Sequence, residues 1–328
     1  MTVDLYPSLR GENLTQWQAF MDRMGLHTEG PAETTVLLRE DGCIAASGSR
    51  QGNVLKYLAV DPAYQGEGLT ASLLTALRRD AFAQGIRHLF LYTKPRNQAL
   101  FAPLFFYPVA KTDQVLLMED RKNGVRDFVQ SLEAPCTHGT VGAAVMHCDP
   151  FTKGHRWLIE TAAARCDWLY IFVLSEDRGR FPAGDRLELV RRGTADLKNV
   201  TVHPTGPYLI SSATFPSYFL KDRATAGDVQ CRLDIEIFAR QFAPRFGITR
   251  RFVGTEPLCP VTAQYNENLA RLLPGMGVEL CRLDRLEQNG APISASAVRA
   301  LLGRGDPDAL KALVPETTFA YLKERELI

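Results

Sequence analysis

From residue 141 onwards, short apolar strands alternate with amphipathic helical segments, and this alternation constrains the fold more than any other feature of the sequence. Parallel strands need a crossover between them, and a helix in each crossover covers one face of the sheet. We therefore predict an α/β fold whose second part is a doubly wound, Rossmann-like parallel sheet. The predicted strands are 141–146, 168–174, 200–203, 250–254 and 278–281, and the predicted helices include 155–165 and 183–196.

The turn after strand 141–146 carries the first of two motifs. Residues 148–155 (CDPFTKGH) link that strand to the next predicted helix. Backbone N–H groups and the helix dipole at such a turn bind phosphate, and ligands of doubly wound sheets lie at this end of the strands. Thr152 adds a hydroxyl, Gly154 allows close backbone approach, and the imidazole of His155 could donate to an α-phosphate oxygen.

The second motif, residues 293–299 (ISASAVR), begins another predicted helix near the end of the chain. Ser294 and Ser296 supply hydroxyls, and the guanidinium of Arg299 can hold phosphate oxygens in bidentate fashion. We expect the two motifs to bind a nucleoside triphosphate between them, with these three residues on the β- and γ-phosphates.

The same residues also have structural interpretations, which the sequence leaves open. Thr152 and Ser294 could serve only as helix N-caps, and Arg299 could be a solvated helix residue. Both motifs occur in order on a matching strand–helix pattern, which favours the binding interpretation. The predicted catalytic set is therefore Thr152, His155 and Arg299. His147 could equally be a core histidine and is left out of it.

The first part of the chain is organised differently. Strands 34–39 and 43–49 are joined by a hairpin signal, strand 56–60 follows, and a helix begins near Leu69. The turn before that helix contains Gln65, Gly66 and Gly68, and it resembles the pyrophosphate-binding turn of the GNAT acetyltransferases. The resemblance implies that these three residues bind a coenzyme-A-like group. Thr70 departs from the small residue usual in that turn.

Residues 119–140 are polar and rich in chain breakers, so we place the linker there. The predicted domains are 1–130, with a GNAT-like fold, and 131–328, with the parallel sheet. No clear carboxylate and tyrosine pair for acetyl transfer is visible in the first domain, which favours a binding role or a scaffolding role over catalysis.

Composition limits the partners and the location. The 38 basic and 37 acidic residues give a net charge of +1, so we expect no bulk attraction to nucleic acid or to an anionic membrane. The seven cysteines form no C-x-x-C pair, the first ten residues do not resemble a signal peptide, and the longest apolar run, 169–174, is too short to cross a bilayer. These features favour a cytoplasmic protein without a metal site of its own.

Several segments of the second part, in order, are similar to the HIGH-type nucleotidyltransferase superfamily and, within it, to the citrate (pro-3S)-lyase ligase family. They are 145–156 (VMHCDPFTKGHR), 181–190 (FPAGDRLELV), 201–204 (TVHP), 208–219 (YLISSATFPSYF), 253–257 (VGTEP) and 293–299. Segment 208–219 is more specific than either phosphate motif. The Cys148-Asp149 pair departs from the family, which usually has asparagines there.

The resemblance implies further contacts with ATP. Phe151 and Gly154 belong to the first motif, Arg186 would face the nucleotide, and Gly254 and Glu256 would lie near the adenine or ribose. Two structural alternatives stay open here, because Arg186 could form a surface ion pair with a neighbouring acid and Glu256 could cap the following turn.

The resemblance also implies a reaction. ATP and acetate would recharge the prosthetic-group thiol of the citrate lyase acyl-carrier subunit through acetyl-adenylate, releasing AMP and diphosphate. Mg²⁺ would accompany ATP, held mainly by its phosphates. Thiol attack needs a base or local positive charge, for which His147 and His203 are both candidates. The aromatic segment 208–219 could line a channel for the pantetheine arm or belong to the core.

Two other functions remain as alternatives. A nucleotidyltransferase could use the same phosphate motifs to adenylylate a phosphate ester such as phosphopantetheine. A protein N-acetyltransferase could use the second domain only to sense a nucleotide. Segments 181–190 and 208–219 favour the ligase over the first alternative, and the missing acid–base pair disfavours the second.

Overall fold

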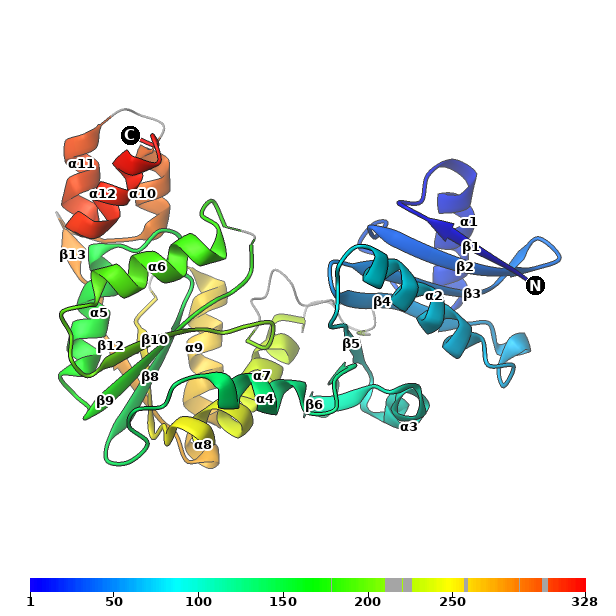
Figure 1. The fold of residues 1–328 in the computed structure, drawn as a ribbon, viewed down its shortest axis with the longest axis horizontal. Coiled ribbons are helices and arrows are strands. Elements are labelled where there is room, and N and C mark those ends of the chain that lie inside the picture. Colours follow the sequence, from blue (N-terminus) through cyan, green and yellow to red (C-terminus); the bar gives the residue numbers. More distant parts are fainter. Residues whose placement is uncertain (178, 210–219, 221–225, 257–258, 289, 303–305) are drawn as a thin grey trace. The chain divides into compact units, whose positions relative to one another are not determined.

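The computed structural model describes residues 1–328 except 178, 210–219, 221–225, 257–258, 289 and 303–305. The chain divides into two compact units, one built on Met1–Gly124 and the other on Val125–Thr214 and Gln230–Ile328. Figure 1 shows the helices and strands of each unit. No helix within the described part of the chain is long and apolar enough to cross a membrane.

The first unit is a seven-stranded sheet in the order β1-β2-β3-β4-β5-β7-β6. Neighbouring strands are antiparallel except β4 and β5, which run parallel. The strands are β1 (Thr2–Tyr6), β2 (Thr34–Glu40), β3 (Cys43–Gln51), β4 (Val54–Val60), β5 (Phe90–Thr93), β6 (Tyr107–Lys111) and β7 (Leu116–Glu119), and the helices are α1 (Gly11–Arg23), α2 (Leu69–Ala83) and α3 (Gln98–Phe101).

The parallel pair β4–β5 is short. It joins Val54 to Phe90 and Leu55 to Leu91, after which β4 separates from β5. Tyr57, at φ +55°, lies in a bulge of β4 at this point. Helix α2 packs on the sheet through five buried residues spaced at helical intervals, which are Leu69, Leu73, Leu74, Leu77 and Ala81. A cavity lies beside the start of α2, between the end of β4 and residues 100–104.

The second unit contains a five-stranded parallel sheet in the order β10-β9-β8-β11-β12. Its strands are β8 (Val141–Met146), β9 (Trp168–Val173), β10 (Val200–Pro204), β11 (Arg250–Gly254) and β12 (Glu279–Leu283). The chain builds outward from β8 to β10, then returns to the other side of β8 for β11 and β12. This order confirms the predicted doubly wound sheet. The strands all run parallel, and the direction in which successive strands are added reverses between β8 and β11, which is the switch point of the sheet.

Helices cover both faces of this sheet. On one face, α5 (Lys153–Ala163) and α6 (Ala183–Gly193) share a core with Leu169 and Ile171 of β9. On the other face, Phe172 packs edge-on against Phe242, with ring centroids 5.3 Å apart. That face is covered by α7 (Ala226–Ile237), a π-helix (Phe238–Phe242), α8 (Ala243–Phe246) and α9 (Pro260–Leu272). A helix α4 (Gly124–Ser131) precedes β8.

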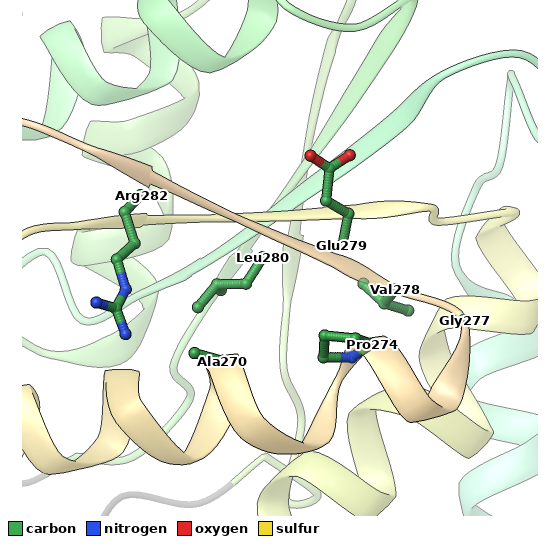
Figure 2. A pocket seen from close by; sticks show the side chains of 7 residues that line it. All are labelled: Ala270, Pro274, Gly277, Val278, Glu279, Leu280 and Arg282. Carbon is green, nitrogen blue, oxygen red and sulfur yellow. The ribbon is translucent and has the colours of Figure 1, made fainter.

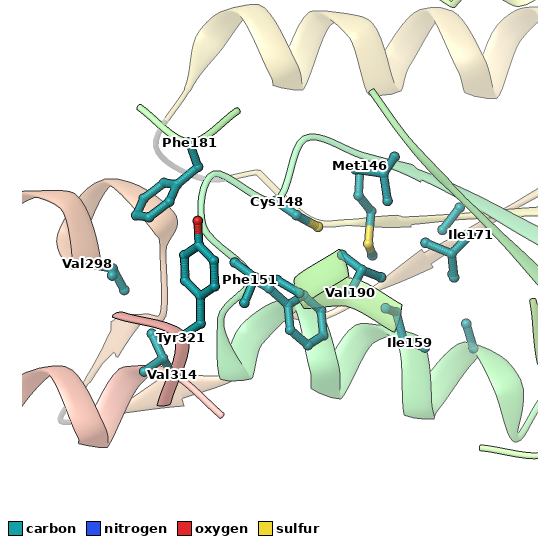
Figure 3. Packing of buried hydrophobic residues seen from close by; sticks show 14 of the residues in the cluster. Met146, Cys148, Phe151, Ile159, Ile171, Phe181, Val190, Val298, Val314 and Tyr321 are labelled. Atoms are coloured by element: carbon teal, nitrogen blue, oxygen red, sulfur yellow. The ribbon is translucent and has the colours of Figure 1, made fainter. Parts of the chain in front are cut away.

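Three C-terminal helices complete the core beside α5 and α6. They are α10 (Ala295–Leu301), α11 (Pro307–Leu313) and α12 (Glu316–Glu324), and a two-stranded ribbon of β13 (Glu287–Gln288) and β14 (Ala291–Pro292) precedes them. Figure 3 shows Val298, Val314 and Tyr321 of this region around the buried ring of Phe151. The last part of the chain is therefore packed against the turn that follows β8.

Candidate functional site

A cavity of about 480 Å³ lies at the switch point of the parallel sheet. Strands β8 and β11 pair at Gly142 with Arg250 and at Ala143 with Arg251, near their amino ends, and the rest of both strands borders the cavity. The start of α5 and the start of α10 also line it. The lining residues from the two sequence motifs are Gly154, His155, Ile293, Ser294, Ala295, Ser296 and Arg299. The structure thus brings both motifs to one cavity, at the position where doubly wound sheets bind ligands.

The first turn of α5 fixes the orientation of the His155 ring. The Thr152 hydroxyl accepts a hydrogen bond from the His155 backbone N–H, at 3.3 Å. In return, Nδ1 of His155 accepts from the Thr152 backbone N–H, at 3.1 Å, and lies 2.9 Å from the Thr152 hydroxyl. A neutral imidazole whose Nδ1 accepts carries its proton on Nε2. The capping box therefore leaves the Nε2–H of His155 as the free donor of a ring that lines the cavity.

Electrostatics keep that donor neutral. The surrounding protein desolvates the ring and, with Arg285 and His147 nearby, lowers the pKa of His155 to about 4. A protonated ring would have to place a hydrogen on Nδ1, facing the Thr152 N–H, which the capping box opposes. His147 also lines the cavity, with an exposed side chain whose pKa is lowered, first by desolvation and then by Arg186. Both imidazoles are therefore neutral near pH 7.

Gly154 joins the two motifs by close approach. A Cβ atom at this position would lie 2.8 Å from the backbone oxygen of Ile293, the residue that begins the second motif. Contacts that short are essentially excluded for a carbon and a backbone oxygen, so a larger residue would push the motifs apart. The predicted reason for a glycine was approach to phosphate, and the structure adds approach between two parts of the chain 139 residues apart in sequence.

The second motif is held by its own side chains. Ser294 caps α10 by accepting from the Ala297 backbone N–H, at 3.1 Å, and Ser296 accepts from Nη2 of Arg299, at 3.0 Å. Nη1 of Arg299 donates to the backbone oxygen of Asp149 and lies 3.4 Å from its carboxylate. The capping role of Ser294 is thus real, while the Arg299 side chain bridges the two motifs instead of projecting into solvent alone.

Asp149 is a site residue that sequence reasoning missed. Its buried carboxylate accepts from the backbone N–H groups of Arg180 and Phe181, at 3.1 and 2.9 Å, in addition to its pairing with Arg299. It therefore ties the turn after β8 to the segment before α6 and to α10. The available signal was its position as an acidic residue where the family usually has an amide, which the sequence analysis noted only as a departure.

Phe151 and Arg186 lie behind the cavity, and neither side chain is among the described residues that line it. The Phe151 ring is fully buried in the core (Figure 3). It stacks on the His155 ring at a centroid distance of 6.0 Å. Arg186 is fully buried and donates to the backbone oxygens of Phe181, at 3.1 Å, His147, at 2.8 Å, and Glu176. The surface ion pair considered for Arg186 is therefore wrong, because its guanidinium holds backbone carbonyls around the turn.

Gly254 and Glu256 lie on the opposite wall. Both line the cavity, where the end of β11 meets the start of α9. The Glu256 carboxylate accepts from the Cys259 backbone N–H, at 3.2 Å, and pairs with Arg285, which donates to the Thr255 oxygen at 2.6 Å. Glu256 thus caps this turn, as its structural interpretation expected. Arg285 is a further cavity residue that the sequence analysis did not identify.

The remaining candidates in this unit are His203, segment 208–219 and a metal site. His203 is buried, its Nε2 bonds the Glu133 oxygen at 2.8 Å, and its ring stacks on Tyr170, so it is a satisfied core histidine. Segment 208–219 falls largely outside the described residues, as does Tyr218 within it. No group of three or more His, Cys, Asp or Glu side chains within the described ranges is arranged to hold a metal ion.

In the first unit, Gln65, Gly66 and Gly68 line a cavity of about 590 Å³. The end of β4, the start of α2 and residues 100–104 form its other walls, which are mostly apolar. Gly66 and Gly68 have φ values of +93° and +74°, which side-chain-bearing residues rarely adopt. These glycines expose the turn before α2, an amphipathic helix of fifteen residues, to the cavity.

A third hollow, about 570 Å³, lies along the edge strand β12 (Figure 2). Its wall combines the end of α9 with apolar residues such as Pro274, Val278 and Leu280, and with the charged side chains of Glu279 and Arg282. None of the predicted site residues lines it. The functional assignment therefore rests on the switch-point cavity.

Comparison with known proteins finds a separate family match for each of two parts of the chain. Residues 141–322 match the family described as citrate lyase ligase C-terminal domain, and residues 3–102 match the acetyltransferase (GNAT) family. The chain is 42% identical to the citrate (pro-3S)-lyase ligase of Klebsiella pneumoniae, over 93% of this chain and 91% of that protein. The corresponding ligases of Escherichia coli strain K12 and Haemophilus influenzae are 40% and 34% identical, over 96% and 97% of this chain and 92% and 97% of theirs.

Proposed function

The chain belongs to the citrate lyase ligase family, and from this membership we propose how its residues carry out the reaction. The enzyme uses ATP to acetylate citrate lyase. We propose two steps, in which acetate first attacks the α-phosphate of ATP to give acetyl-adenylate and diphosphate. The thiol of a coenzyme-A-like prosthetic group on the acyl-carrier subunit then takes the acetyl group and releases AMP. The observation that carries this proposal is the switch-point cavity, where both phosphate motifs meet.

For the first step, we assign the phosphate contacts to the two motifs. The neutral Nε2–H of His155 would donate to an α-phosphate oxygen, where negative charge grows in the transition state. The Thr152 hydroxyl would support it, and Ser294, Ser296 and Arg299 would bind the β- and γ-phosphates. Arg299 retains N–H groups beyond those used on Ser296 and Asp149. These donors are already ordered by hydrogen bonds within the protein, so little reorganisation is needed when ATP binds.

We propose that Mg²⁺ enters with ATP and is held by its phosphates. Two carboxylates near the cavity are already engaged, since Asp149 binds two backbone N–H groups and Arg299, and Glu256 binds Arg285 and the Cys259 N–H. Asp284 also lines the cavity but forms no group of three ligand side chains with other described residues. The described residues therefore offer no cage for the ion, and its chemistry when present would be to shield phosphate charge.

For the second step, we propose His147 as the group that assists thiol attack. A free thiol is largely protonated at neutral pH and needs a base. The His147 ring is exposed to the cavity and its lowered pKa leaves it neutral, so it can accept a proton. His203 is disfavoured because its ring is buried and bonded to a backbone oxygen.

We propose that the first unit binds the coenzyme-A-like prosthetic group in the cavity beside Gln65, Gly66 and Gly68. The backbone N–H groups of this turn would hold pyrophosphate, and the apolar walls formed by the end of β4 and residues 100–104 would hold the pantetheine arm. The Gly68→Asp substitution adds a negative charge there. We expect it to raise the KM for the carrier subunit and leave acetate-dependent adenylation unchanged.

The matched control for this variant is Gly85→Asp. Gly85 follows the other end of α2, also has a positive φ of +78°, and does not line the cavity. It reproduces the backbone strain and the added charge without the proposed contact. A carrier KM that is unchanged in Gly68→Asp, or raised equally in both variants, would indicate that the unit is only a scaffold.

We also propose a cytoplasmic location. All seven cysteines are free thiols, which suits a reducing compartment, and the reaction consumes ATP.

The experiment that tests the ligase function is exchange of labelled diphosphate into ATP, with and without acetate. Acetate-dependent exchange means that a carboxylate is adenylated. Exchange that ignores acetate and appears with phosphopantetheine would identify a nucleotidyltransferase and overturn the assignment. The second step is tested by adding the carrier in its thiol form and measuring acetylation of that thiol.

A further inference from the structure

Arg251 is a buried cation in the wall of the switch-point cavity. It lies on β11, three residues before Gly254, and is only 2% exposed. Its Nη2 donates to the Tyr265 hydroxyl, at 2.9 Å. Its Nε and Nη1 atoms are buried and have no hydrogen-bond partner in the part of the chain that the structure describes.

The surroundings of Arg251 fix its guanidinium in place. The group lies over the Phe238 ring, 4.2 Å from its centroid, at the start of the π-helix Phe238–Phe242. The Tyr265 hydroxyl donates a hydrogen bond to the buried Asp234 carboxylate, and burial raises the pKa of Tyr265 well above its usual value. The Tyr265 oxygen is therefore committed to Arg251 on one side and Asp234 on the other.

A buried guanidinium with two unsatisfied nitrogens is unfavourable unless an anion completes it. An unmade buried hydrogen bond costs more than a made one contributes, and the cost is larger for a charged group. Arg251 borders a cavity, so a ligand that enters can supply the missing acceptor. An isolated structural role would be better served by a group with all of its hydrogen bonds made.

We propose that Arg251 binds the carboxylate of acetate inside the cavity. The inference rests on the proposed ligase function and assigns the acyl substrate to residues of this chain. The ligand must be small, since β8 and β11 still pair at Arg251 and the strands have only begun to separate there. Arg251 is a single cation with the Asp234 carboxylate nearby, so it suits a ligand with one negative charge. The phosphates of ATP carry more charge, and their proposed donors lie in the two motifs.

The position agrees with the chemistry of the first step. Acetate is already ionised at neutral pH, so no base is needed. One carboxylate oxygen forms a bond to the α-phosphorus, the bond from that phosphorus to the bridging oxygen breaks, and diphosphate leaves with the electron pair. Arg251 would orient the carboxylate in the cavity that also contains the His155 donor.

The test uses Arg251→Met in the full-length enzyme, with Arg250→Met as the matched control. Arg250 is the preceding residue of β11, does not line the cavity, and pairs with Glu279 at 2.9 Å. In acetate-dependent diphosphate exchange, we expect Arg251→Met to raise the acetate KM about 10- to 100-fold, as for loss of charged hydrogen bonds. The ATP KM should change less than about two-fold, and Arg250→Met should match the wild type. Arg251→Lys, which keeps the charge, should recover part of the acetate affinity.

A binding measurement separates this inference from the ligase function. Acetate should raise the melting temperature of the wild type and of Arg250→Met but not of Arg251→Met, and neutral acetamide should raise none of them. Arg251→Met also removes the hydrogen bond to Tyr265 and the cation near the buried Asp234 carboxylate, so the acetate shift of each variant is measured against its own melting temperature without ligand.

Several outcomes would overturn the assignment. An unchanged acetate KM and unchanged acetate protection in Arg251→Met would reject the subsite while leaving the ligase function intact. Protection by inorganic phosphate that is as strong as that by acetate, and lost in the same variant, would make Arg251 a phosphate site instead. Wild-type exchange that ignores acetate would reject the ligase function, and the melting experiment would then decide on its own whether Arg251 holds acetate.

Discussion

At the scale of single residues, the hydrogen bonds of His155 determine how its ring can act. Its Nδ1 is committed as an acceptor to the Thr152 N–H, so the ring can offer only Nε2–H to a ligand. An imidazole of this kind is a hydrogen-bond donor of fixed direction and not a reservoir of positive charge. In the proposed mechanism, Arg299 would supply the positive charge near the phosphates, and His155 would respond to negative charge that develops during the reaction.

The protonation state of His155 can be measured directly. The folded pKa of about 4 lies below the ordinary value of 6.5, so the folded protein binds fewer protons than the unfolded chain between these values, and this residue makes stability fall as the pH is lowered from 6.5 towards 4. We expect nitrogen NMR of the imidazole at pH 6 to show a neutral ring with its proton on Nε2. A ring that titrates near 6.5 would contradict the structure.

The contribution of His155 to the reaction rate can be measured with a substitution. We expect His155→Asn to lower the rate of acetate-dependent exchange by about 100- to 1,000-fold, as for loss of one donor to a developing negative charge. His138→Asn is the control, because His138 is exposed and lies outside the cavity. A loss of less than ten-fold would assign the α-phosphate to another donor.

At the scale of elements, the site depends on the contact between the start of α5 and the residue before α10. Gly154→Ala would place a carbon 2.8 Å from the Ile293 oxygen, and we expect overpacking to cost about 1–3 kcal/mol of stability and to raise the KM for ATP. The control is Gly184→Ala in α6, where an added Cβ meets nothing within 4 Å and should stabilise the helix by about 0.5–1 kcal/mol. Calorimetry measures the stability of the two variants, and exchange kinetics measure their KM for ATP. Equal stability and equal KM in the two variants would contradict the role of the Gly154 contact.

The elements themselves were largely predictable, because local pattern determines them. Strands β8 and β11 have the predicted bounds, since each is a short segment with apolar residues that is bounded by breakers and turn residues. The roles of individual residues were harder to predict. Arg186 lies in helix α6, and the sequence of that helix does not indicate that the guanidinium donates to three backbone carbonyls from other parts of the chain. The separation of β8 from β11 depends on residues more than a hundred positions apart, which no local pattern records. Arg251 contacts Tyr265 and Phe238 on other elements, and the pattern of β11 itself does not indicate these partners.

At the scale of the whole molecule, the two units have separate cores and separate cavities. We therefore expect two transitions in calorimetry, with ATP raising one and free coenzyme A, as a probe for the prosthetic group, raising the other. A ligand at 100 times its Kd should stabilise its own unit by about 2.7 kcal/mol. Gly68→Asp should abolish the shift with coenzyme A and keep the shift with ATP. A single transition that responds to both ligands would contradict independent units.

The pairing of Asp149 with Arg299 also bears on how the enzyme is made. The two residues are 150 positions apart, so a growing chain contains the first long before the second. A nascent chain that has emerged only as far as β12 already contains the first unit and the parallel sheet, but it lacks the second motif, to which the proposed function assigns phosphate contacts. If that assignment holds, a chain that stops at β12 should not catalyse acetate-dependent exchange of diphosphate into ATP, so the proposed adenylation would begin only once the chain extends past Arg299.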